Sequence, residues 1–248
     1  MRFAAVMAVL FFFGATSARA EWIDLELPTG VKLKAAFEKP ELVGKAHAVI
    51  YLHGRMPRTA GYEAAADRDY DVAAFARAFA YAGFIAIAPL RKTPVNAENG
   101  DDAVAEGLAT VLAAATHPHR QHDVLRVSVV GISEGGLMAL WALSQMPDLT
   151  KGVVLSPSSL TNGNGRAASM NMDTFIQTGA AKSIRAPVLL TVGDRETRTA
   201  KRNATLVSET LMKAHRRFWY IKNYPEKRRW FHQPHNAYME DVVAFLKR

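Results

Sequence analysis

The chain has 248 residues, of which 49% are hydrophobic, so it can bury one large core or at most two small ones. Its net charge is +8, which is moderately basic. Because it contains no cysteine, disulfide bonds and a lipoprotein acyl anchor are excluded, and the folded chain must be stabilised by packing. We expect a single domain.

The amino-terminal segment predicts a secretory signal peptide over residues 1–20. Met1 and Arg2 precede an apolar run over 3–15, and small residues around Arg19 form a cleavage site that would leave Glu21 as the mature start. The run of about 13 apolar residues is too short for a membrane span of roughly 20. We therefore expect a bacterial periplasmic or secreted protein that keeps no stable membrane anchor after cleavage, with its folded domain over 21–248.

Strand-like apolar segments alternate with helical patterns along the rest of the chain. The first two strands, 22–27 and 31–37, flank a Pro28-Thr29-Gly30 turn and predict an antiparallel hairpin. Further strands are predicted at 48–52, 84–89, 126–130, 151–155, 187–192 and 218–223, and helices at 69–82, 103–115, 134–146, 200–215 and 237–247. This alternation predicts a three-layer α/β fold, with a small insertion at 158–184 that would shape a substrate site as a cap.

One motif indicates chemistry. The sequence Gly131-Ile132-Ser133-Glu134-Gly135 fits G-x-S-x-G between an apolar strand and a helix, which makes Ser133 a candidate nucleophile. A serine alcohol needs a base to remove its proton before it can attack an ester or amide. We expect the two glycines to leave room for the sharp turn, and both tolerate backbone angles that are closed to other residues.

The order of elements, Leu52-His53-Gly54 after the third strand, and the motif around Ser133 resemble the α/β-hydrolase superfamily over nearly all of the mature chain. The compact size and the Gly135-Gly136 pair are similar to the dienelactone-hydrolase-like group and to the catalytic domains of prolyl-oligopeptidase-type peptidases. The resemblance implies a three-layer αβα sandwich with a mostly parallel eight-stranded sheet and no cofactor. Dienelactone hydrolases proper carry cysteine at the nucleophile position, so Ser133 favours a general carboxylesterase that works through an acyl-serine intermediate.

The resemblance also implies an oxyanion hole. Its two backbone N–H donors would come from Glu134, directly after the nucleophile, and from Arg55, directly after Gly54. His53 is expected to brace this loop and to take no direct part in catalysis.

The acid and the base of the implied catalytic triad each have two candidates. After the strand that ends at Val192, the family's spacing selects Glu196, whereas its usual residue type selects Asp194. For the base we prefer His232 to His235, because His235 follows a proline at the expected start of the closing helix.

Several other patterns suggest alternative functions. Arg229 stands where related sequences often place the catalytic histidine, so a non-catalytic binding protein on the same fold is one alternative. A small serine peptidase is a second alternative. His117, His119 and His122 are read as a solvated loop, with no metal expected. The basic and aromatic residues near the carboxyl terminus are read as a strand with charged ends, with no nucleic-acid partner expected.

We also expect cations around the site. Five of them follow predicted strands at the carboxyl edge of the sheet, and they favour a small-molecule ester that carries a negative charge. These residues are Arg55, Arg58, Arg91, Lys92 and Arg195. The sequence does not identify the acyl group, the alcohol group or the oligomeric state.

Overall fold

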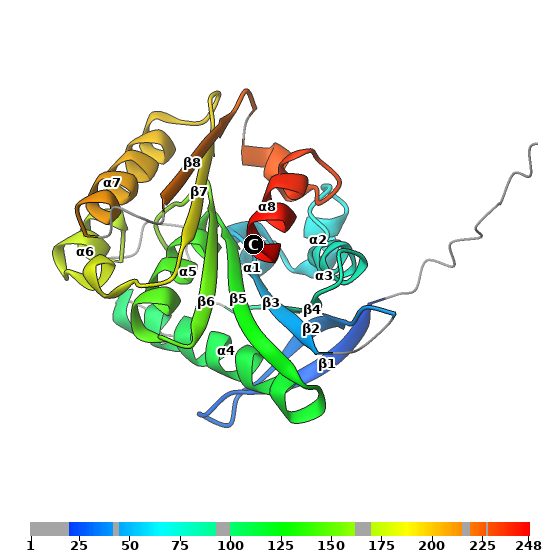
Figure 1. Ribbon diagram of the computed structural model, residues 1–248. Helices are drawn as coiled ribbons and strands as arrows, with labels where there is room; N and C mark the ends of the chain where they lie inside the picture. The colour runs from blue at the N-terminus through cyan, green and yellow to red at the C-terminus, as the bar shows by residue number, and fades with distance from the viewer. Residues whose placement is uncertain (1–19, 42–44, 93–99, 162–169, 215–218, 227) are drawn as a thin grey trace, which may run out of the picture.

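The computed structural model describes residues 20–41, 45–92, 100–161, 170–214, 219–226 and 228–248, which form one eight-stranded sheet with helices on both faces (Figure 1). In spatial order the strands are β1 (Glu21–Glu26), β2 (Lys32–Glu38), β4 (Ile85–Pro89), β3 (Ala46–Leu52), β5 (Val124–Ile132), β6 (Leu149–Leu155), β7 (Val188–Gly193) and β8 (Trp219–Tyr224). The β1–β2 and β2–β4 pairs are antiparallel, and the other pairs are parallel. The predicted hairpin and the mostly parallel sheet are confirmed.

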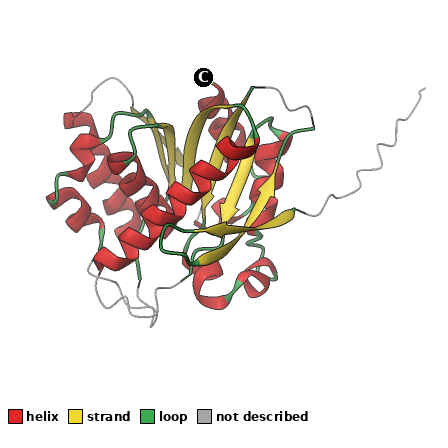
Figure 2. Cartoon of the chain, turned by 90° about the horizontal axis from the view of Figure 1, so that it is seen from below, coloured by secondary structure: helices red, strands yellow, loops and turns green. Residues whose placement is uncertain are grey.

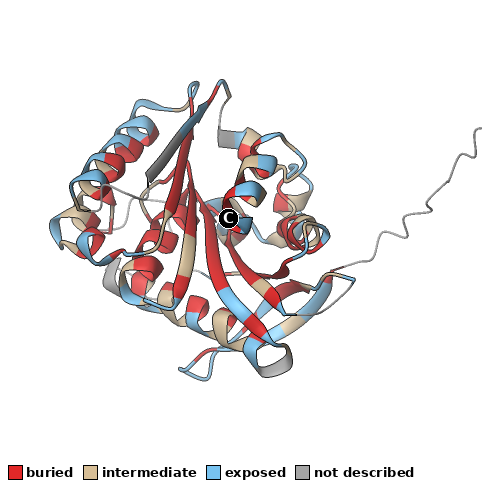
Figure 3. Ribbon diagram, in the orientation of Figure 1, coloured by how far each residue is buried: buried red, intermediate tan, exposed pale blue. Residues whose placement is uncertain are grey.

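Two hydrophobic clusters fill the spaces between the sheet and its helical layers (Figures 2 and 3). On one face lie α4 (Gly100–Gln121), α5 (Glu134–Gln145), α6 (Met172–Gln177), α7 (Arg198–Ala214) and the 3-10 turn η1 (Ala180–Ser183). The other face carries α2 (Tyr62–Ala66), α3 (Val72–Tyr81), α8 (Tyr238–Lys247) and the 3-10 turn η2 (Arg228–His232). Strand β3 contributes side chains to both clusters, since Ile50 packs into the first cluster and Tyr51 into the second.

Some elements differ from those predicted. Helix α4 continues through Pro118 to Gln121, so the loop expected around His117 and His119 is wrong: both lie in the last turns of this helix. The short helix α1 (Arg55–Ala60), α2 and η2 were not predicted, because each is only five or six residues long and shows no full helical period. Helix α1 and the turn η2 contribute residues to the site described below.

Of the predicted insertion at 158–184, residues 162–169 lie outside the described residues. Its later part packs between α5 and α7, where Phe175 is fully buried and its ring meets the Trp141 ring edge-on at 5.1 Å. Asn171 caps α6 by accepting a hydrogen bond from the Thr174 N–H at 3.0 Å. This part of the segment is therefore built into one helical layer.

The predicted signal peptide, apart from Ala20, also lies outside the described residues. Within the described chain, none of the helices has both the length and the apolar character that a membrane crossing requires.

Candidate active site

Ser133 lies in a sharp turn between β5 and α5. Its backbone angles are φ 56° and ψ −119°, a region that non-glycine residues rarely adopt, and its N–H donates to the Leu155 carbonyl at 2.9 Å. Gly131 and Gly135 tolerate such angles, but neither of them lies in the left-handed region. The strain is held by the candidate nucleophile itself.

The glycines of the motif are needed for space, as predicted. A Cβ atom at Gly131 would lie 2.1 Å from the Gly135 carbonyl oxygen, and one at Gly135 would lie 1.9 Å from the Leu52 carbonyl oxygen. The end of β3, the turn and the start of α5 therefore approach one another at backbone contact distance.

A pocket of about 310 Å³ opens above Ser133. His232, Arg55 and Glu134 also line it, so the structure brings together four of the residues that the sequence singled out. His235 is exposed and is not among the residues that line this pocket. Of the two candidate bases, His232 is the one that lines the same pocket as Ser133.

The loop after β3 lies directly against the nucleophile. A Cβ atom at Gly54 would be 3.1 Å from the Ser133 Cβ, and the N–H of Gly54 donates to the Tyr70 hydroxyl at 2.7 Å. Helix α1 begins at Arg55 and α5 begins at Glu134, and the first N–H groups of a helix have no acceptor within the helix. Both expected oxyanion donors thus belong to residues that border the pocket.

The two candidate acids differ in burial. Both follow β7 in a turn where the Glu196 N–H donates to the Gly193 carbonyl at 3.0 Å. Asp194 is exposed, whereas Glu196 is half-buried and its Oε1 is shielded from solvent. A carboxylate that orients a histidine acts best away from competing water, so this burial favours Glu196.

His53 is fully buried below the loop. Its Nδ1 lies 2.8 Å from the Gly54 carbonyl, and its Nε2 accepts the Arg91 N–H at 3.0 Å. The Arg91 guanidinium also donates to the His53 carbonyl. Burial, together with the positive charge of Arg91, lowers the pKa of His53 to about 3, so the ring is neutral and braces the loop.

The depressed pKa of His53 predicts a pH dependence of stability. In the unfolded chain this histidine protonates near pH 6.5, while in the folded chain it stays neutral down to about pH 3. The contribution of neutral His53 to the free energy of unfolding is therefore complete above about pH 6.5, and it falls by about 1.4 kcal/mol per pH unit as the pH drops towards 3.

Urea unfolding at pH 7 and at pH 5 measures this effect. Between the two pH values, the free energy of unfolding should fall less for His53→Gln than for wild type. An equal fall in both proteins would contradict the prediction. His235→Gln, at an exposed position, is the control.

A buried ion pair connects α1 and α5, the helices that begin at the two expected oxyanion donors. The Arg58 guanidinium donates to the Glu134 carboxylate at 3.0 and 3.1 Å, and the side chains are only 5% and 1% exposed. The same guanidinium donates to the Thr161 carbonyl and hydroxyl at 2.8 and 2.7 Å, and the Thr161 N–H donates to Glu134 at 2.8 Å. Arg58 and Arg91 are thus enclosed, so the prediction that both stand on the rim is wrong.

No family model matches the chain, and no curated protein matches it. Solved structures do match. An esterase from Pyrococcus furiosus, Pf2001, superposes with a TM-score of 0.67 at 16% identity over 92% of each chain. Est1E from Butyrivibrio proteoclasticus gives 0.61 at 14% identity, over 91% of this chain and 96% of that one. An acylaminoacyl peptidase from Pyrococcus horikoshii gives 0.66 at 18% identity, over 92% of this chain and 41% of the peptidase.

This chain has the α/β-hydrolase fold. The resemblance that the sequence carries is therefore confirmed at the level of fold. At 14 to 18% identity the similarity does not assign an activity, which has to be argued from the site.

Two residues of this site were not predicted from the sequence. The Ser158 hydroxyl lies 3.0 Å from the Ser133 hydroxyl, and the Ser158 N–H donates to the Ser133 carbonyl at 3.0 Å. Tyr70 lines the pocket from the loop between α2 and α3. Ser158 could have been found, because it follows the carboxyl end of β6, where polar residues of an α/β sheet meet the site. For Tyr70 the sequence offers no comparable signal.

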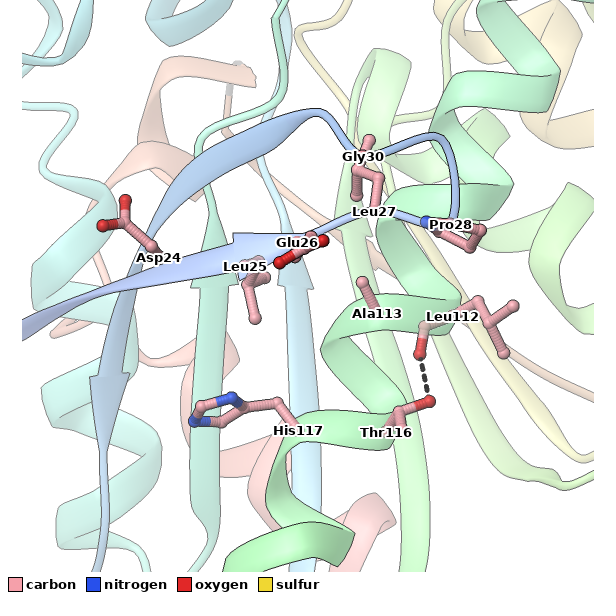
Figure 4. Close-up of a pocket in the computed structure, with 10 residues that line it drawn as sticks. All are labelled: Asp24, Leu25, Glu26, Leu27, Pro28, Gly30, Leu112, Ala113, Thr116 and His117. Atoms are coloured by element: carbon pink, nitrogen blue, oxygen red, sulfur yellow. Dashed lines mark hydrogen bonds between the residues drawn. The ribbon is translucent and has the colours of Figure 1, made fainter.

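A larger groove lies elsewhere on the α/β-hydrolase domain. It has a volume of about 710 Å³ and runs between the β1–β2 hairpin and α4, with Glu26 and His117 among its walls (Figure 4). The Thr116 hydroxyl bonds the Leu112 carbonyl of its own helix at 2.8 Å. None of the candidate catalytic residues lines this groove. Within the described residues, no cluster of histidine, aspartate and glutamate side chains could hold a metal ion.

Proposed function

We propose that the protein is a serine hydrolase that cleaves carboxylic esters through an acyl-Ser133 intermediate. The observation that carries the proposal is the pocket in which Ser133, held in a strained turn, and His232 stand together with the residues of both expected oxyanion donors. The fold shared with two esterases agrees with it.

The reaction follows from these positions. The Ser133 oxygen attacks the ester carbonyl carbon while the His232 imidazole takes its proton. The N–H groups of Arg55 and Glu134 stabilise the tetrahedral oxyanion, and the leaving alkoxide receives the proton from His232. A water molecule then gives a proton to His232 as it attacks the acyl carbon. The bond from that carbon to the Ser133 oxygen breaks, His232 returns the proton to this oxygen, and the acid and the free serine are released. Glu196 is the residue that would orient the imidazole and stabilise its charged form.

A fluorophosphonate probe tests the nucleophile, because only an activated serine reacts with it. We expect the wild-type protein to be labelled and to hydrolyse p-nitrophenyl acetate, and we expect Ser133→Ala to abolish both. His232→Ala should lower the rate at least 10³-fold, whereas His235→Ala should leave it unchanged. A wild-type protein that neither reacts with the probe nor hydrolyses the ester would overturn the proposal in favour of a binding protein.

The structure gives little support to a binding protein. Arg229 is exposed and pairs with Asp69 at 3.4 Å, so it does not occupy the position of the base. A peptidase is the second candidate, motivated by the shared fold of the acylaminoacyl peptidase. Hydrolysis of an acylated aminoacyl p-nitroanilide at a rate that exceeds ester hydrolysis would favour that candidate.

Within the ester class we propose a substrate that carries a negative charge. Arg55 is exposed and lines the pocket. Lys92 is exposed after β4, which neighbours β3, and Arg195 is exposed after β7, which lies farther along the sheet. These cations would raise the local concentration of an anion, and salt would screen the effect. A carboxylate-bearing ester should therefore lose more of its kcat/KM between 20 and 500 mM salt than a neutral ester does. Equal losses of kcat/KM for the two esters would contradict a preference for anionic substrates.

We also propose that the protein is exported with cleavage after Ala20. Sequencing of the mature amino terminus from a bacterial host should then begin at Glu21, and a retained Met1 would contradict it.

A further inference from the structure

The aromatic ring of Tyr70 lies flat against the imidazole of His232. The ring centroids are 4.1 Å apart and the planes differ by 6°. Tyr70 is only 1% exposed and belongs to the second hydrophobic cluster, where its ring and that of Phe75 make a T-shaped contact. A buried side chain with so little freedom provides a fixed surface for the candidate base.

The hydroxyl of the same side chain holds the oxyanion loop. It accepts the Gly54 N–H at 2.7 Å, one residue before the expected donor Arg55, and lies 3.2 Å from the Tyr51 hydroxyl. Burial raises the pKa of Tyr70 to about 12, so the group is a neutral phenol at the pH of any ordinary assay.

The segments that carry these groups are far apart in the sequence. Tyr70 follows α2, Gly54 follows β3 and His232 ends η2, and η2 packs with α2 and α3 on one face of the sheet (Figure 1). An exposed ion pair between Asp69 and Arg229 joins the same two segments. Tyr70 is thus the residue through which the base and the oxyanion loop contact a common support.

We propose that Tyr70 is a positioning residue of the Ser133 reaction, which holds His232 through its ring and the loop of Gly54 and Arg55 through its hydroxyl. This inference rests on the proposed function. Its physical basis is that an error of about 1 Å in the placement of a catalytic group can cost about 10²-fold in rate. The ring has a second effect, because its face attracts the positive charge that His232 gains when it takes the serine proton.

The two contacts can be separated by substitution. Tyr70→Phe keeps the ring and removes the acceptor of the Gly54 N–H, whereas Tyr70→Leu removes both. Tyr51→Phe is the matched control, since it deletes the neighbouring buried hydroxyl while Tyr51 stacks on Phe75 at 4.0 Å and touches neither the loop nor the base in any described contact.

We expect Tyr70→Phe to lower kcat about tenfold, as the loss of one acceptor from a buried N–H predicts, with KM changed less than twofold. Tyr51→Phe should stay within twofold of wild type. In Tyr70→Leu the acid-side midpoint of the kcat/KM profile should fall by about half a pH unit, since the imidazolium loses its aromatic partner. Apart from Tyr70 itself, the charged groups that share the pocket with His232 are Arg55 and Glu134, and Glu196 is the proposed partner of its imidazole. All three are unchanged in both Tyr70 variants.

A readout without catalysis separates this inference from the proposed function. The His232 imidazole signal, assigned by its absence in His232→Gln, is titrated by NMR in proteins that also carry Ser133→Ala. A lower midpoint in the Tyr70→Leu background supports the ring contact, even if the wild-type protein were inactive. Equal kinetics of Tyr70→Phe and Tyr51→Phe, or equal midpoints in the wild-type and Tyr70→Leu backgrounds, would overturn the proposal. If Tyr70→Leu does not fold, the comparison of the two phenylalanine variants decides.

Discussion

Replacement of Arg58 by methionine is expected to lower the free energy of unfolding by about 3–5 kcal/mol. The Glu134 side chain is 1% exposed, and its carboxylate would remain in the interior without the guanidinium that neutralises it. The cost of such an unpaired buried charge exceeds the value of the packing that methionine restores.

The same substitution should disturb the chemistry. Arg58 belongs to α1, which begins at Arg55, and Glu134 is the first residue of α5. The ion pair therefore fixes the relative position of the two helices whose first N–H groups would bind the oxyanion. Because loss of one such donor typically costs 10²- to 10³-fold in rate, we expect kcat to fall at least tenfold in the fraction that remains folded.

Urea unfolding and ester hydrolysis measure the two effects. Arg202→Met is the control, because Arg202 pairs with Asp173 at 2.6 Å with both side chains largely exposed, and we expect no measurable change there. Adding Glu134→Gln to Arg58→Met should restore part of the stability, since it removes the orphaned charge. An Arg58→Met protein as stable as Arg202→Met would show that the carboxylate is solvated or protonated at little cost.

The sequence predicted the strands of this protein well because each is a short apolar run bounded by turn residues. Strand β4 is an example, since its sequence Ile85–Pro89 is apolar and all of its residues are buried. The G-x-S-x-G motif also predicted its own geometry, since the requirement for two glycines comes from local backbone contacts. What it did not predict is that Ser133, and not a glycine, adopts the positive φ angle.

The parts of the site that the sequence could not predict depend on contacts between distant segments. Arg58 follows a strand, as rim cations do, and only the approach of α5 and Thr161 reveals that it is enclosed. Likewise, Tyr70 looks like one more aromatic residue near a helix start, and its role depends on where η2 packs. Pairing of this kind is a property of the tertiary structure and leaves no periodic or spacing signal.

Replacement of Gly135 by alanine is expected to lower activity about 10²-fold and to destabilise the fold. The added Cβ would lie 1.9 Å from the Leu52 carbonyl oxygen and 2.8 Å from that of His53, both of which are backbone atoms. Since Cβ atoms essentially never approach other atoms within 3.0 Å, α5 and the end of β3 must separate by at least about 1 Å. Such overpacking costs typically 1–3 kcal/mol, and a shift of this size next to Ser133 costs about 10²-fold in rate.

Gly136→Ala is the matched control, because it adds the same methyl group to the same helix one residue later. There the Cβ would meet the nearest atoms, from Pro157 and Val154, at 3.3 Å, which small adjustments can accommodate. Alanine also favours a helix over glycine by about 0.8–1 kcal/mol, which offsets the crowding. We therefore expect the free energy of unfolding of Gly136→Ala to lie within about 1 kcal/mol of the wild-type value, and we expect the variant to retain most of its esterase activity. If both variants lost activity equally, the close approach of β3 to α5 at Gly135 would not be what shapes the nucleophile turn.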